Sequence, residues 1–175
     1  MTPYDTVADK PCTLSPEALK GLIEFLKGMP AHLESVLAGR SEKQLRHKSG
    51  PEASAFSLVE QVHHLRDIEV EGYSRRLQRL LEEDNPVLPD IDGTRLAVER
   101  AYNQKPLAPA LDEFVAVRRA NVELLRRLTP ADLTRVGEME GVGQITLAQL
   151  LEMWRNHDSV HRAELHELLA VVKGL

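Results

Sequence analysis

Residues 146–172 read TLAQLLEMWRNHDSVHRAELHELLAVV, and apolar side chains recur through most of this stretch at intervals of three and four residues. That spacing places them on one face of an α-helix. Thr146 and Gln149 have the spacing of a capping box, which marks a helix start, and Gly174 stands where helices commonly stop. We therefore expect a helix over about residues 146–172, with a core stripe formed by Leu147, Leu150, Leu151, Trp154, Leu165, Leu168, Leu169 and Val172.

The apolar stripe of this helix is interrupted in its middle. His157, Asp158 and His161 occupy the positions at which the stripe should continue. Burial of such groups costs on the order of several kcal/mol unless hydrogen bonds or a metal ion compensate. Because His157 and His161 are four residues apart, their rings project from one helix face and can share a divalent ion. The alternatives are a buried hydrogen-bonded network that includes Asp158, and solvent-exposed histidines.

Proline placement locates the other long helices. No proline lies between Pro51 and Pro86 or after Pro130, and an interior proline costs a helix about 3 kcal/mol. We expect long helices over about residues 15–37, 57–84 and 107–128, with Pro30 kinking or breaking the first.

Shorter segments connect these helices. A capping box from Ser57 to Glu60 opens the helix at residue 57, and another from Ser41 to Gln44 opens a short helix through residue 46. Residues 85–105 form a long, turn-rich connection with a short helix over about 94–102, and such a connection often forms a lid or a site wall. The sequence GEMEGVGQ, residues 137–144, predicts a loop or a small hairpin.

Composition limits the class of protein. A chain of 175 residues with 42% hydrophobic residues fits one globular domain, which we place over residues 1–175. A net charge of −5 excludes a nucleic-acid-binding module built on a basic surface. The single cysteine, Cys12, excludes an intramolecular disulfide framework and favours a cytoplasmic location, and no membrane span or signal peptide is expected. With only 4% aromatic residues and no β-branched alternation, we expect an all-α four-helix bundle with a long connection between the second and third helices.

A third metal ligand would come from the helix expected at residues 57–84, which offers His63 and His64. Its core stripe contains Leu58, Val62, Leu65, Tyr73 and Leu80. By helical angle, His63 lies nearer this stripe and His64 lies on its flank, so periodicity favours His63 as the buried histidine. A bundle helix contacts two neighbours, however, and periodicity alone leaves both histidines open as the ligand.

Several motifs together resemble the DinB superfamily. The family has a characteristic pattern on its second helix, matched here by FSLVEQVHHLRDIE, residues 56–69, and a His-Asp-x-x-His pattern on its last helix, matched by HDSVHRAEL, residues 157–165. The segments EEDNPVLPDID, residues 82–92, and LRRLTPADL are also similar to family sequences. Gln61 stands where the family usually has an apolar residue, and Phe56 where tryptophan is common.

The resemblance implies a four-helix bundle with a divalent metal ion held by three histidines. The family ligand directly before leucine falls on His64, and the other two fall on His157 and His161. Imidazole ligands favour Zn²⁺, with Ni²⁺ as the alternative, and three of them leave a coordination position open for water or a substrate thiol. Asp158, Glu164 and Glu60 are candidates for hydrogen bonds to the bound histidines.

The resemblance leaves more than one function open, and it assigns no catalytic residue. We expect a metal-dependent enzyme that acts on a small molecule, either as a thiol S-transferase on a low-molecular-weight thiol or as a hydrolase. The alternatives are a non-catalytic metal-binding or stress-response protein, and a helical interaction module whose histidines form a core network. By analogy with similar bundles, we expect a homodimer.

Overall fold

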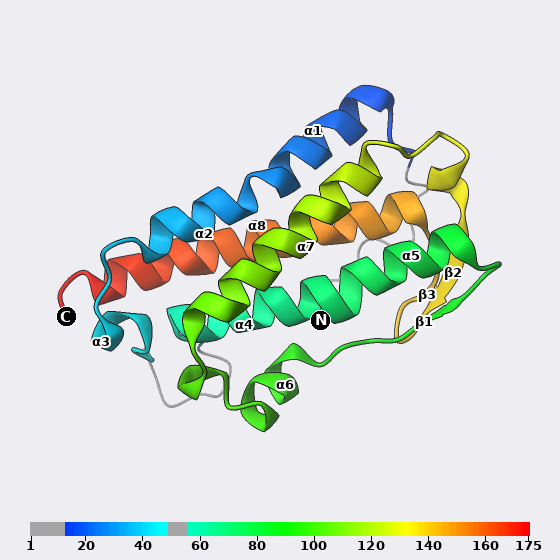
Figure 1. Cartoon of the computed structure of the whole chain (residues 1–175). Helices are drawn as coiled ribbons and strands as arrows, with labels where there is room; N and C mark the ends of the chain where they lie inside the picture. The colour runs from blue at the N-terminus through cyan, green and yellow to red at the C-terminus, as the bar shows by residue number, and fades with distance from the viewer. Residues whose placement is uncertain (1–12, 49–55) are drawn as a thin grey trace.

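The computed structural model describes residues 13–48 and 56–175 and forms a helical bundle with a small sheet at one end (Figure 1). The helix expected at residues 15–37 is broken in two near Pro30, and the other long helices lie where the sequence predicts them. The helices are α1 (Pro16–Lys27), α2 (Met29–Leu37), α3 (Glu42–Leu45), α4 (Leu58–Asp67), α5 (Arg75–Glu82), α6 (Gly93–Glu99), α7 (Leu107–Leu125) and α8 (Leu147–Val172). Two 3₁₀ turns, η2 (Tyr102–Gln104) and η3 (Asp132–Thr134), flank α7.

Side-chain capping sets the start of three of these helices. Each expected capping box is formed, at Ser41 for α3, at Ser57 for α4 and at Thr146 for α8. In each box the cap hydroxyl accepts a hydrogen bond from a backbone N–H that the helix itself leaves unpaired. The N-terminal ends of α4 and α8 are therefore fixed locally, and this fixes which residues of each helix face the other.

The helix expected at residues 57–84 contains a feature that the sequence analysis missed. A π-helical segment, η1 (Ile68–Ser74), joins α4 to α5 without interrupting the rod. A π-helical turn holds more residues than an α-helical turn, so it rotates the residues that follow it around the helix axis. Both Glu69 and Tyr73 are thereby buried, with exposed fractions of 1% and 0%.

The described chain contains a small sheet of three strands in the order β1-β2-β3. The hairpin alternative for residues 137–144 is confirmed, because β2 (Val136–Met139) pairs antiparallel with β3 (Gly143–Thr146). The strand β1 (Val87–Leu88) was not expected; it pairs parallel with β2. The sheet lies beside the start of α8 and leaves the architecture a helical bundle (Figure 1).

Buried apolar side chains of the described ranges fall mainly into two clusters that lie toward opposite ends of the bundle. Along α8, Trp154 belongs to one cluster and Leu165 to the other. Along α7, Val122 belongs to the cluster that contains Trp154, and Phe114 belongs to the cluster that contains Leu165. The polar residues that interrupt these stripes therefore lie at one level of the bundle, between the two apolar clusters.

At that level a buried charged group, here called the polar layer, joins three helices: Glu69 of η1, Arg118 of α7 and Asp158 of α8. The Arg118 guanidinium donates to Glu69 Oε2 at 2.8 Å and to Asp158 Oδ2 at 2.5 Å. Further hydrogen bonds reach Glu69 from Asn121 and from the Trp154 indole. Burial raises the pKa of Glu69. Burial also acts to raise the pKa of Asp158, but the attraction and hydrogen bonds of Arg118 and His157 together outweigh it and lower this pKa to about 2.

No helix in the described ranges is both long enough and apolar enough to cross a bilayer.

Replacing Arg118 tests whether the polar layer holds the bundle together. The Arg118→Met substitution keeps the side-chain bulk but leaves two buried carboxylates without a cation. We expect the free energy of unfolding to fall by about 3–5 kcal/mol, measured by urea denaturation at pH 7. The matched control is Arg119→Met on the exposed neighbour, which should change it by no more than about 0.5 kcal/mol. Equal stability of the two variants would contradict a structural role for the polar layer.

Candidate metal centre

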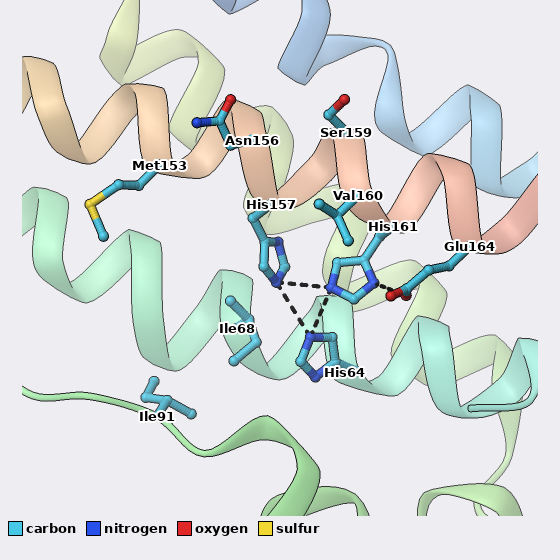
Figure 2. A pocket seen from close by; sticks show the side chains of 10 residues that line it. All are labelled: His64, Ile68, Ile91, Met153, Asn156, His157, Ser159, Val160, His161 and Glu164. Carbon is cyan, nitrogen blue, oxygen red and sulfur yellow. Dashed lines mark hydrogen bonds and ion pairs between the residues drawn. The ribbon is translucent and has the colours of Figure 1, made fainter. Parts of the chain in front are cut away.

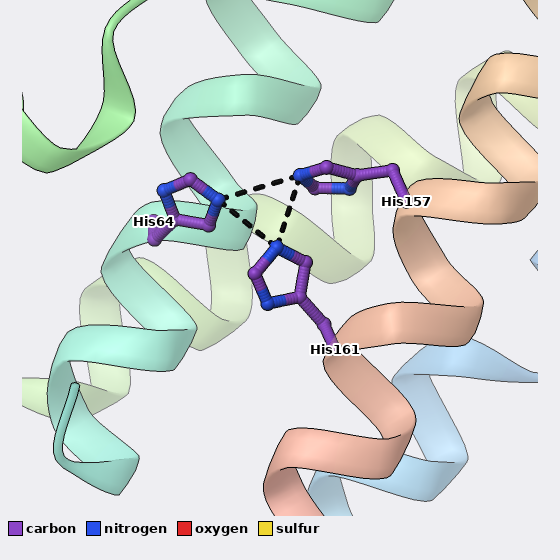
Figure 3. Close-up of side chains that lie close together, drawn as sticks. All are labelled: His64, His157 and His161. Carbon is purple, nitrogen blue, oxygen red and sulfur yellow. Dashed lines mark hydrogen bonds between the residues drawn. The ribbon is translucent and has the colours of Figure 1, made fainter. Parts of the chain in front are cut away.

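The side chains of His64, His157 and His161, here called the histidine triad, converge on one point between α4 and α8 (Figure 3). The Nε2 atom of His161 lies 3.1 Å from the Nε2 atoms of both His64 and His157. The remaining side of the triangle, from His64 Nε2 to His157 Nε2, measures 3.3 Å. The spacing of His157 and His161 on one helix face is as the sequence predicts, and α4 supplies the third ring from the opposite side.

The ring of His161 is held in one tautomer by two acceptors. Its Nδ1 lies 2.8 Å from Gln61 Oε1 and 2.9 Å from Glu164 Oε2. Gln61 Nε2 in turn donates to Glu164 at 2.8 Å, which fixes the orientation of the amide. Because both neighbours of Nδ1 are acceptors, Nδ1 carries a proton, and Nε2 is the ring nitrogen that faces the triad.

The ring of His157 is placed by the polar layer and by Tyr73. Its Nδ1 lies 4.0 Å from Asp158 Oδ1, and its ring packs edge-on against Tyr73 with centroids 5.6 Å apart. Asp158 is itself held by Arg118, so the polar layer sets the charge beside this histidine. Asp158 thus has the buried hydrogen-bonding surroundings that its place in the stripe predicts.

The ring of His64 is placed by packing. It lies between the ring of Phe56, with centroids 5.3 Å apart, and the backbone of Gly93. Within the described part of the chain, His64 Nδ1 has no hydrogen-bonding partner.

The neighbouring His63 is the buried histidine that periodicity favours, at 5% exposure, but it lies apart from the triad. Its ring stacks on Tyr102, and its Nε2 lies 3.2 Å from the carbonyl oxygen of Pro106. The helix α4 packs against both α7 and α8 and therefore buries two of its faces. His63 lies on one of these faces and His64 on the other. Family resemblance selects His64, and the His64 ring is the one that lies with His157 and His161. Periodicity indicates which ring is buried, but it does not indicate which ring meets the histidines of α8.

The donor set of the triad fits a divalent transition-metal ion. For nitrogen ligands about 2.0–2.1 Å from an ion, adjacent nitrogens lie about 3.3 Å apart in tetrahedral geometry and about 2.9 Å apart in octahedral geometry. The three Nε2 separations of 3.1–3.3 Å fall within this range. In a metal-bound triad each neutral ring would direct its Nε2 lone pair at the ion, and the cation would offset the repulsion among the three lone pairs.

Burial keeps two rings of the triad neutral, as metal coordination requires. It lowers the pKa of His157 to about 4, and the nearby Asp158 carboxylate only partly opposes this effect. Burial also lowers the pKa of His64 well below its ordinary value, and the other two rings add to the shift. For Glu164, burial acts to raise the pKa, but the hydrogen bonds from His161 and Gln61 and the attraction of the histidines together outweigh it. The pKa is therefore lowered, and the group is a carboxylate at neutral pH.

A cavity of about 530 Å³ opens directly onto the triad (Figure 2). Its volume lies in the usual range for small-molecule sites. Besides the three histidines, an apolar wall and a few polar groups line it: Ile68, Ile91, Met153 and Val160, with Asn156, Ser159 and Glu164. Ile91 comes from the long connection between α5 and α7, which therefore forms part of the site wall as expected.

The candidate Glu60 does not contact the triad. Glu60 belongs to the capping box of α4, where it accepts from the Ser57 backbone N–H at 2.8 Å and pairs with Lys48. Cys12 lies outside the described residues.

Three further residues contribute to the site but were not predicted to do so from the sequence. The role of Gln61 could have been inferred, because a polar residue there interrupts an apolar stripe. Arg118, four residues after Phe114 and four before Val122, carries the same signal. The contact of Gly93 with His64 has no periodic signal, since it joins residues far apart in the chain.

The lowered pKa of His157 predicts how stability depends on pH when no metal is bound. An unfolded histidine has a pKa of about 6.5, so between pH 6.5 and 4 the unfolded chain binds the proton and the folded chain does not. In the presence of EDTA, this residue should stabilise the fold by roughly 3 kcal/mol above pH 6.5 and lose that contribution as the pH falls to 4.

Urea denaturation from pH 7 to pH 4 measures this effect. The His157→Gln variant should show a shallower fall in the free energy of unfolding than wild type. The control His166→Gln, on an exposed position of the same helix, should keep the wild-type slope. Parallel curves for wild type and His157→Gln would contradict a buried, neutral His157.

Comparison with known proteins gives relatives of nearly full length. A protein of Oceanobacillus iheyensis named "Putative metal-dependent hydrolase OB0782" is 26% identical over 148 residues, covering 83% of each chain. A Geobacillus thermodenitrificans protein named "Putative metal-dependent hydrolase" is 25% identical over 161 residues, covering 90% of this chain and 88% of its own.

Among solved structures, YfiT from Bacillus subtilis, described as "a probable metal-dependent hydrolase with an unusual four-helix bundle topology", is similar with a TM-score of 0.81. The match has 24% sequence identity and covers 91% of this chain and 90% of YfiT, and it establishes the fold. The family model described as the DinB superfamily matches residues 26–165, which include all three histidines of the triad. The chain therefore belongs to the DinB superfamily.

Proposed function

We propose that this chain binds one divalent transition-metal ion through the Nε2 atoms of His64, His157 and His161 and is a metal-dependent hydrolase of a small molecule. The observation that carries the proposal is the convergence of three Nε2 atoms, 3.1–3.3 Å apart, at the floor of a cavity of about 530 Å³. It is supported by the relatives from Oceanobacillus iheyensis and Geobacillus thermodenitrificans, each of which is named a "Putative metal-dependent hydrolase". Zn²⁺ is the ion that imidazole ligands favour, and Ni²⁺ is the alternative.

A bound ion would supply Lewis acidity, which activates a water or thiol nucleophile at neutral pH. The chain's own residues prepare the site for it. Glu164 and Gln61 hold the proton of His161 on Nδ1, so the opposite nitrogen stays free to coordinate. The carboxylate of Glu164 also lines the cavity, within reach of a molecule bound there.

The cavity lining favours a substrate with an apolar body and a small polar end. Ile68, Ile91, Met153 and Val160 form the apolar wall, and burial of apolar surface against them would stabilise the complex by about 25 cal/mol per Å². Asn156 and Ser159 of α8 also line the cavity, and their side chains project from α8 away from the histidine triad (Figure 2). The cavity supports an enzyme over a non-catalytic metal-binding protein, because a site that only stores a metal needs no adjoining space.

Metal content tests the ligand set. Protein purified without a histidine tag should contain about one divalent ion per chain, measured by inductively coupled plasma mass spectrometry. The variants His64→Ala, His157→Ala and His161→Ala should each lose most of the metal. The matched control is His63→Ala, which removes the adjacent ring and should keep it. Equal metal in wild type and all four variants would contradict the assignment, and loss in His63→Ala alone would move the ligand to its neighbour.

A second experiment distinguishes the hydrolase from the thiol transferase that the family resemblance also allows. The cobalt-substituted protein is titrated with cysteine as a low-molecular-weight thiol, and its visible absorption is recorded. A thiol-using site should show new thiol-dependent bands, because sulfur changes the ligand field of Co²⁺. An unchanged spectrum with cysteine and other small thiols, together with turnover of ester or amide substrates that requires the metal, would leave hydrolysis as the activity.

A further inference from the structure

The backbone of Gly93 lies against the ring of His64. A Cβ atom added at residue 93 would lie 2.3 Å from Cε1 and 2.5 Å from Nδ1 of His64. Ordinary contacts of such atoms begin near 3.4 Å, so any side chain at this position would push the imidazole away by about an ångström. The ring of His64 thus occupies the space that a side chain of residue 93 would fill.

The backbone conformation does not explain the glycine. Gly93 is the first residue of α6, and the described glycines with positive φ are Gly39, Gly141 and Gly143. An alanine in an ordinary helical conformation is favoured over glycine, because it restricts the unfolded chain. The contact with His64 is therefore the feature of this position that requires glycine.

His64 differs from the other two histidines in what orients its ring. His161 is oriented by hydrogen bonds to Gln61 and Glu164, and His157 lies beside the Asp158 carboxylate. Nδ1 of His64 has no such partner in the described ranges. Its ring is instead confined between the backbone of Gly93 and the ring of Phe56.

The segment that carries Gly93, residues 89–100 and here called the strap, is fixed at both ends to the rod that carries His64. At its start, the carbonyl oxygen of Pro89 accepts two hydrogen bonds from Arg76, at 2.6 and 3.2 Å. At its end, Arg100 pairs with Asp67 at 2.5 Å and with Glu71 at 2.6 Å.

The middle of the strap is also held against this rod. Ile91 packs over Gly72 of η1, and the Asp92 side chain caps α6 by accepting from the Arg95 backbone N–H at 2.9 Å. The strap is therefore joined to the His64 rod at both ends and through Ile91, and these contacts hold Gly93 against the imidazole.

We propose that Gly93 is a positioning residue for the metal site: its bare backbone holds the His64 ring so that Nε2 meets His157 and His161. The proposal rests on the proposed function, because it assigns the position of one ligand of that metal site. The strap then has two roles: through Gly93 it positions the His64 ring, and it also places Ile91 in the cavity wall.

A double-mutant cycle with His64→Ala tests the contact in metal-free protein. Gly93→Ala alone should lower the melting temperature by about 2–10 °C, because the added methyl group overpacks the site. In the His64→Ala background the ring is gone, so the same substitution should leave the melting temperature unchanged or raise it by about 1–4 °C. If Gly93→Ala fails to fold, folding of the double variant supports the contact equally well.

Co²⁺ titration tests the consequence for the metal site. Gly93→Ala should bind Co²⁺ about 10–100-fold more weakly than wild type, as expected when the support of a metal ligand is disturbed. The matched control is Gly21→Ala in α1, where an added Cβ meets no atom within 4 Å; it should keep wild-type affinity.

Two results would overturn the positioning role: an equal loss of thermal stability in both backgrounds, or wild-type Co²⁺ affinity in Gly93→Ala. A wild-type chain that binds no Co²⁺ would instead overturn the proposed function. The melting temperatures of the double-mutant cycle would then still show whether Gly93 confines the His64 ring. Failure of the positioning role and failure of the proposed function can therefore be distinguished.

Discussion

The bundle depends on compensating polar groups that lie in the middle of its apolar core. On α8, Asp158 and His161 are buried at 0% and 8% exposure between Trp154 and Leu165. An uncompensated charge or lone pair at such a place would cost more than a small domain can sustain. Three neighbouring elements contribute to the compensation: α7 through Arg118, η1 through Glu69, and α4 through His64 and Gln61.

The compensation has two parts with different consequences. The polar layer is held by internal hydrogen bonds, because Arg118 donates to both Glu69 and Asp158 and the Trp154 indole also donates to Glu69 Oε2. Its hydrogen bonds fix η1, α7 and α8 relative to one another along the bundle axis. The histidine triad differs, since three imidazole Nε2 atoms converge on one point without a carboxylate or guanidinium among them. We infer that the first part fixes the frame and that the second is completed by a cation.

Much of the fold could be predicted because it is local. The three capping boxes and the four apolar stripes depend on residues three and four apart, and they place the long helices within a few residues of their observed ends. The π-helical turn at Ile68–Ser74 could not be predicted in this way, because it shifts the hydrogen-bond register without changing the apolar pattern. The strand Val87–Leu88 was missed because it is two residues long and pairs with a hairpin far along the chain.

The candidate site shows the same division between local and distant signals. His157 and His161 stand out as polar interruptions of a stripe, and the structure brings them together with His64. The choice between His63 and His64 depended on which neighbour each face of α4 contacts, and only resemblance to a family supplied that information. The contact between Gly93 and His64 joins two segments through tertiary packing, so no pattern in either segment reveals it.

The most direct test of the metal site is anomalous X-ray diffraction from a crystal of the protein loaded with Zn²⁺, recorded on both sides of the zinc absorption edge. The account predicts one strong anomalous peak per chain, about 2.0–2.1 Å from the Nε2 atoms of His64, His157 and His161. A peak that lies elsewhere on the chain, or a triad that stays free of zinc at saturating concentration, would contradict it.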